Sequence, residues 1–182
     1  VYLASCTQSA DFPVTPGTPI QSVFGTGRQD GVILKLNTNL TSVLFSSFFG
    51  GSGDDACFVM AINPITGNLY VGGGTTSTNL PGNKTGAIAS IYQQGETDGF
   101  VTEIASNGSA IIKTTYIGTV GNDMVYGLKF DRFGFPYIMG TTTGNWTVVN
   151  AAFSNVFGGN NAKQFISKLQ PDLSAYVYST VF

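Results

Sequence analysis

Short apolar runs alternate with turn residues along the whole chain. In its middle third, runs at 56–63, 69–76, 100–105 and 110–117 are separated by segments rich in Gly, Asn, Thr and Pro. The runs are rich in Val, Ile, Phe, Tyr and Thr, which suit a pleated and half-buried surface. No segment of ten or more residues keeps the apolar period of an amphipathic helix. The pattern therefore predicts an all-β chain of short strands.

These strands belong to an internal repeat. Equivalent positions lie 67 or 68 residues apart. The YVGGGT segment begins at Tyr70, and its two counterparts begin at Tyr2 and Tyr137. The matching segments are 2–7, 70–75 and 137–142; 30–33 and 98–101; 50–55 and 118–123; and 46–49, 114–117 and 179–182. Each repeat holds four strand-like runs, and Asn107-Gly108 is a strong hairpin-turn signal between the last two runs of the middle copy.

Four short antiparallel strands per repeat are the unit of a β-propeller blade. One blade cannot bury both of its faces, so neighbouring blades must pack face to face. We expect three blade repeats in one propeller domain, at 1–49, 50–117 and 118–182, with the first blade lacking its first strand. Because propellers usually close with at least four blades, the sequence predicts a fragment of a larger propeller. The alternative is a small protein that closes by pairing with copies of itself.

Three long segments carry a recognisable consensus. They read GGSGDDACFVMAINPITGNLYVGGGTTSTNLP at 50–81, DGVILKLNTNLTSVLFSSFFGG at 30–51 and TDGFVTEIASNGSAIIKTTYIG at 97–118. These motifs resemble the bacterial SBBP family of seven-bladed β-propeller repeats. The resemblance implies a large secreted or cell-surface protein, in many cases from bacteria with type 9 secretion, and it supplies no catalytic motif. The third repeat departs from the pattern, since Lys163 stands where Asp30 and Asp98 stand.

Composition removes several classes of function. The chain has no His, which excludes the usual catalytic triads and most zinc sites. Its net charge is −2 and its eight basic residues are scattered, so we expect no nucleic-acid partner. No apolar run approaches the roughly 18 residues of a membrane helix, so no membrane insertion is expected. Cys6 and Cys57 are interpreted as small apolar strand residues, and whether they pair stays open.

The repeat provides a test for functional residues, because a residue that recurs at the period is expected to be structural. Asp30 and Asp98 recur, and we expect them to accept backbone N–H groups in a turn. Asp55 and Asp123 recur after a Gly-rich turn and are interpreted as turn caps. The alternative is a calcium site at Asp54, Asp55 and Asp123, although Ca²⁺ takes about six to eight oxygen ligands.

A ligand site is expected on the loops between the second and third strands of each repeat, at 8–29, 77–97 and 143–161. These loops differ from copy to copy, and loops on a rigid scaffold commonly carry binding sites.

Within these loops the candidate ligand-binding residues are Asn79, Asn145 and Trp146, the only Trp of the chain. Trp146 stands where Phe12 and Leu80 stand, so the alternative is a loop anchor packed between blades.

The sequence thus predicts a non-enzymatic propeller module, extracellular or at the cell surface, for adhesion, ligand binding or scaffolding. Its partner would be a protein or a glycan, and no cofactor is expected apart from the alternative calcium. No acidic pair is placed for glycoside hydrolysis, so no catalytic residue is predicted. Two alternatives stay open. One is a structural subunit that assembles with itself and completes its open blade with a neighbouring chain. The other is a carbohydrate-active enzyme with its site in the propeller channel.

Overall fold

The structure is a computed structural model that describes residues 1–16, 20–151 and 163–182. Eleven strands and no helix occur within these residues. The strands are β1 (Tyr2–Thr7), β2 (Asp30–Leu36), β3 (Val43–Phe49), β4 (Asp55–Ile62), β5 (Leu69–Thr75), β6 (Asp98–Ile104), β7 (Ile111–Ile117), β8 (Asp123–Phe130), β9 (Pro136–Thr142), β10 (Lys163–Leu169) and β11 (Tyr176–Val181).

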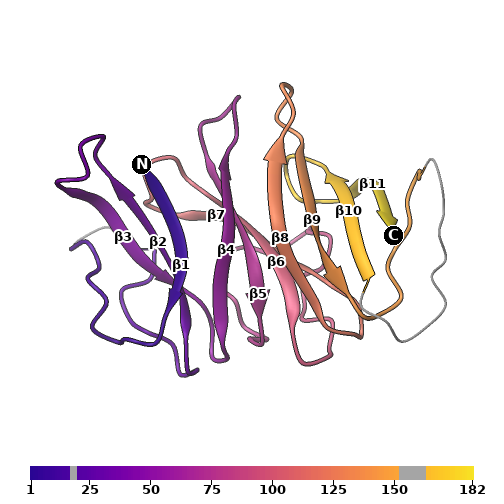
Figure 1. The fold of residues 1–182 in the computed structure, drawn as a ribbon, viewed down its shortest axis with the longest axis horizontal. Coiled ribbons are helices and arrows are strands. Elements are labelled where there is room, and N and C mark those ends of the chain that lie inside the picture. The colour runs from indigo at the N-terminus through magenta and orange to yellow at the C-terminus, as the bar shows by residue number, and fades with distance from the viewer. Residues whose placement is uncertain (17–19, 152–162) are drawn as a thin grey trace.

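The strands form three antiparallel sheets, each a simple meander (Figure 1). β1–β2–β3 form a three-stranded sheet, and β4–β5–β6–β7 and β8–β9–β10–β11 form four-stranded sheets. The sheets stand next to one another in chain order along the long axis of the molecule. The predicted all-β architecture of antiparallel propeller blades is therefore confirmed.

Strand register repeats from sheet to sheet. Tyr70 pairs with Glu103 between β5 and β6, Tyr2 pairs with Lys35 in the first sheet, and Tyr137 pairs with Lys168 in the third. The sequence repeat is therefore also a repeat of backbone pairing. In both four-stranded sheets the first strand also has a register shift at the same place, at Cys57/Val59 in β4 and at Val125/Gly127 in β8.

The core lies between the sheets, where their faces pack together. Every residue of β5 and β6 is buried, because the middle sheet is covered on both faces. Side chains alternate along β5, as the two-residue period of a strand requires. Val71 belongs to the cluster shared with the first sheet, which includes the Phe49–Phe100 ring pair at 5.1 Å. Tyr70 belongs to the cluster shared with the third sheet.

The long loop of each repeat runs back along the last strand of its own sheet. Backbone hydrogen bonds join the loop to that strand at Thr15–Ser46 (3.0 Å), Asn83–Thr114 (2.9 Å) and Val149–Ser179 (2.9 Å). An uncovered edge strand offers unpaired N–H and C=O groups to other chains. The loops therefore cover the outer edge of every sheet, in addition to any role in binding.

Candidate functional site

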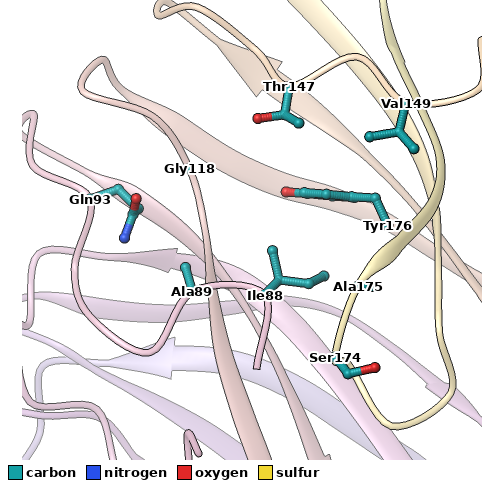
Figure 2. Close-up of a pocket in the computed structure, with 9 residues that line it drawn as sticks. All are labelled: Ile88, Ala89, Gln93, Gly118, Thr147, Val149, Ser174, Ala175 and Tyr176. Carbon is teal, nitrogen blue, oxygen red and sulfur yellow. The ribbon is translucent and has the colours of Figure 1, made fainter. Parts of the chain in front are cut away.

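A pocket of about 420 Å³ lies between the second and third sheets (Figure 2). It falls within the size range of small-ligand sites, which is roughly 300–1,000 Å³. Its wall is built from Ile88, Ala89, Gln93, Gly118, Thr147, Val149, Ser174, Ala175 and Tyr176.

Two of the predicted variable loops build most of this wall. The loop before β6 supplies Ile88, Ala89 and Gln93, and the segment after β9 supplies Thr147 and Val149. The remaining wall comes from Gly118, after β7, and from the start of β11 with the turn before it.

Backbone hydrogen bonds hold both loops in place. The Ile88 N–H donates to the Leu173 carbonyl at 2.9 Å, and the Ala89 N–H donates to Thr115 Oγ1 at 3.0 Å. Val149 forms a β-bridge with Ser179. The pocket therefore has a fixed frame, as a binding site requires.

Figure 2 shows the Tyr176 hydroxyl pointing toward Gly118, between Thr147 and Ile88. Burial raises the pKa of Tyr176 above its ordinary value, so the hydroxyl keeps its proton at neutral pH. The phenol is therefore a neutral group that can donate and accept hydrogen bonds. No side chain of the wall carries a charge.

A pair of buried carboxyl groups lies behind Gly118. A methyl group placed on Gly118 would lie 2.7 Å from Asp98 Oδ1 and 3.1 Å from Asp123 Oδ2. Both acids are fully buried. Burial, and then the neighbouring Asp123, raise the pKa of Asp98 to about 7, although the Gln93 N–H donates to Asp98 and opposes this shift.

The same arrangement recurs at the junction of the first and second sheets. A methyl group on Gly50 would lie 2.7 Å from Asp55 Oδ2 and 2.8 Å from Asp30 Oδ1. Burial also raises the pKa of Asp30 and of Asp55. One carboxyl oxygen each of Asp30, Asp98 and Asp123 is buried without a hydrogen-bond partner. Since these acids recur at the period, we interpret them as parts of the blade junctions.

The structure does not bring the three calcium candidates together. Asp55 caps its turn by accepting from Gly51 N (2.7 Å) and Ser77 Oγ (2.7 Å), whereas Asp123 accepts from Thr119 N (2.6 Å) at the other junction. Asp54 forms an ion pair with Arg28 at 2.6 Å. No group of three His, Cys, Asp or Glu side chains suited to a metal ion occurs in residues 1–16, 20–151 and 163–182.

Trp146 is an anchor of its loop in this structure. Its ring is 9% exposed and stacks on Phe165 with centroids 3.8 Å apart, and its Nε1–H donates to Ser179 Oγ at 2.8 Å. Asn79 is exposed and accepts from Ser52 N at 2.8 Å, which ties its loop to the Gly-rich turn. Asn145 is exposed next to Trp146. Neither asparagine lines the pocket, and the three predicted ligand residues do not converge.

Sequence reasoning missed Gln93, Thr147 and Tyr176, although the repeat carries a signal for two of them. Thr147 stands where the other copies have Pro13 and Pro81. Tyr176 pairs with Leu169 in the third sheet. The equivalent pairs are Ile111 with Ile104 in the second sheet and Val43 with Leu36 in the first, so Tyr176 stands where the other copies have Ile111 and Val43. Both residues break the period by introducing a hydroxyl group at the pocket.

Both cysteines are free, Cys6 exposed and Cys57 buried.

Three antiparallel sheets with repeated register, packed face to face, define a module of the β-propeller class. Residues 112–145 match the model of the SBBP family, described as a beta-propeller repeat. This segment therefore matches an SBBP repeat, and the resemblance to the repeat of this family is confirmed there. The matched segment runs from β7 to just beyond β9, so it crosses from the second sheet into the third.

No curated protein matches the chain. In the described ranges, no helix has the length and apolar character needed to cross a membrane.

Proposed function

We propose that this chain is a non-enzymatic binding module of a larger secreted or cell-surface protein, and that it attaches to a protein or a glycan through the pocket between its second and third sheets. The observation that carries the proposal is the make-up of that pocket. Two loops that differ between repeats build it, and Thr147 and Tyr176 introduce polar groups where the repeat has apolar ones. A residue that departs from the repeat is not required by the blade architecture, so such residues are the candidates for a functional role.

Attachment of the full chain to a surface tests this proposal. The chain is coupled to beads, and retention on intact bacterial cells and on extracellular polysaccharide is measured. Thr147→Trp should abolish retention, because the larger ring would fill the pocket. Val148→Trp is the matched control, since Val148 is exposed and does not line the pocket. Absence of retention for the unaltered chain, or equal retention for both variants, would contradict the proposal.

We also propose that the chain has no catalytic activity. Glycoside hydrolysis uses two carboxyl groups on either side of the scissile bond. The acids at the junctions are fully buried, and no acidic or basic side chain lines the pocket. We expect no new reducing ends when the chain is incubated with soluble polysaccharides. Release of reducing ends in proportion to added chain would favour the enzyme alternative.

An open sheet edge favours a second candidate role in self-assembly. In the two four-stranded sheets, β5 pairs with the first strand β4, and β9 pairs with the first strand β8. Their counterpart in the first sheet, β1, pairs only with β2 among the described strands. A free edge accepts an added strand through main-chain hydrogen bonds. Sedimentation of the full chain tests this role. Concentration-dependent oligomers are expected if a neighbouring chain completes the sheet, and a strict monomer at all concentrations would remove this candidate.

A further inference from the structure

The pocket between the second and third sheets is lined by polar side-chain groups whose hydrogen-bonding capacity is unused. In the part of the chain that the structure describes, the Thr147 and Tyr176 hydroxyls have no hydrogen-bond partner. The amide nitrogen of Gln93 donates to the Ile91 carbonyl at 2.7 Å, which leaves its side-chain oxygen free to accept. Gln93 and Tyr176 are partly buried and Thr147 is exposed. A ligand that covers these groups must offer them hydrogen-bond partners, because a polar group removed from water without a partner costs free energy.

The charge of the surroundings excludes two ligand classes. No acidic or basic side chain lines the pocket, so a charged ligand finds no counter-ion on the wall. Asp98 and Asp123 lie behind Gly118 and are fully buried, so they are out of reach as partners for a cation. Whenever either is ionised it repels an anion. The pocket therefore favours a neutral ligand.

The covered sheet edges argue against an extended peptide as the ligand. Peptides commonly bind sheet proteins by adding a strand to a free edge. Here the Tyr116 N–H of β7 already donates to the Ala89 carbonyl at 3.0 Å, and the Val149 and Ser179 backbones bond to each other on β11. Both strand edges beside the pocket are therefore occupied by the chain's own loops.

A sugar ring matches what the wall offers. One face of a sugar ring carries C–H groups, which suit the apolar side chains of Ile88 and Val149 and the half-buried ring of Tyr176. Its hydroxyls both donate and accept, as do the hydroxyls of Thr147 and Tyr176. The free oxygen of Gln93 adds one more acceptor.

We propose that this pocket binds a neutral sugar residue of a glycan, an inference that rests on the binding function proposed above and names its ligand class. Thr147, Tyr176 and Gln93 hydrogen-bond to the hydroxyls of the sugar, and Ile88 and Val149 contact its C–H face.

An oligosaccharide array tests the inference with the full chain as probe. Neutral oligosaccharides should bind, and those carrying carboxylate or sulfate groups should not. For the strongest neutral ligand, calorimetry should show about 3- to 10-fold weaker binding in Tyr176→Phe and in Thr147→Val, as expected for one lost hydrogen bond each. Tyr178→Phe is the matched control on the same strand and should bind like the unaltered chain. Thermal melting shows that each variant is folded.

Three results would overturn the inference: preference for acidic oligosaccharides, no binding of any neutral oligosaccharide at millimolar concentration, or unchanged affinity in both pocket variants. A treatment of the cell surface separates this failure from failure of the proposed function. Periodate oxidises sugar diols and should abolish retention on cells, whereas protease should not. If protease abolishes retention and periodate does not, the ligand is a protein, and the binding function stands without the sugar. If the chain is not retained at all, both proposals fail.

Discussion

At the scale of single residues, each blade junction contains a pair of fully buried acids. Asp98 and Asp123 pack against Gly118, and Asp30 and Asp55 pack against Gly50 in the same way. Burial raises the pKa of all four carboxyl groups. Removing a carboxylate from water disfavours its charged form, and a second carboxylate nearby adds to the effect. The junctions are therefore most stable when these groups are protonated.

The pKa of Asp98 sets the direction of a pH dependence. Its folded pKa of about 7 lies above the unfolded value of about 3.9, so between these values the folded state binds more protons than the unfolded state. The contribution of Asp98 to the free energy of unfolding is therefore fully present at low pH and is lost as pH rises toward and through 7. We expect the free energy of unfolding to fall by about 2–3 kcal/mol between pH 5 and pH 8, measured by urea denaturation.

Asp98→Asn should flatten this pH dependence, because the amide stays neutral and its oxygen can still accept from the Gln93 N–H. Asp131→Asn is the control, since Asp131 pairs with Lys168 at 2.9 Å and has a lowered pKa. It should keep the slope of the unaltered chain from pH 5 to pH 8. Identical slopes in the unaltered chain and Asp98→Asn would show that Asp98 is ionised in the folded state throughout this range.

At the scale of elements, the long loops serve both the scaffold and the pocket. The loop at 77–97 places Leu80 in the core at 1% exposure and pairs with β7 through Asn83 and Ala89 before it reaches Gln93. The sequence predicted this loop as a variable segment that carries a ligand site. In the structure the first half of the loop is also part of the blade, through buried Leu80 and the backbone bonds of Asn83 and Ala89 to β7.

Leu80→Ala should therefore lower the free energy of unfolding by about 2–4 kcal/mol, as is usual for truncation of a buried leucine. Thr85→Ala lies five residues further along the same loop at an exposed position and should change stability by less than about 0.5 kcal/mol. Chemical denaturation of the two variants provides the comparison. Equal stability of both variants would mean that the whole loop is an appendage.

The strands were predictable from sequence for a physical reason. Their pairing depends on a two-residue period and on turn signals that are local in the chain, and the repeat shows each pattern several times. The pocket depends instead on where two non-repeating loops meet, which no local pattern encodes. Tyr176 was nevertheless detectable, because a Tyr replaces Ile111 and Val43 at one register position. The exposure of the Trp146 ring could not be read from sequence, so ligand binding and loop anchoring both stayed open for this residue until the structure placed the ring against Phe165.

At the scale of the whole molecule, stability is distributed unequally among the sheets. The middle sheet has neighbours on both faces, whereas the first and third each share one core cluster with it. β1 is also unpaired on one side among the described strands. Local opening is easiest where few buried contacts and hydrogen bonds must break.

Hydrogen exchange followed by mass spectrometry should show this gradient. Amides of β5 and β6 should exchange slowest, and those of β1 should exchange faster than those of β9, its counterpart in the third sheet. β9 is the internal comparison because it occupies the same blade position but pairs on both sides. Equal protection of β1 and β9 would mean that the free edge of β1 is covered, as the self-assembly candidate requires.

The pocket in Figure 2 takes its walls from two successive repeats, so its specificity belongs to a pair of neighbours and to neither repeat alone. Strand register is the same in every sheet, so a repeat can exchange places with another without disturbing the backbone pairing within it. Reordering the repeats within a gene would therefore bring different loops together at each junction. Recombination alone would then generate new combinations of recognition surfaces from a fixed stock of loops, with no point mutation in any of them.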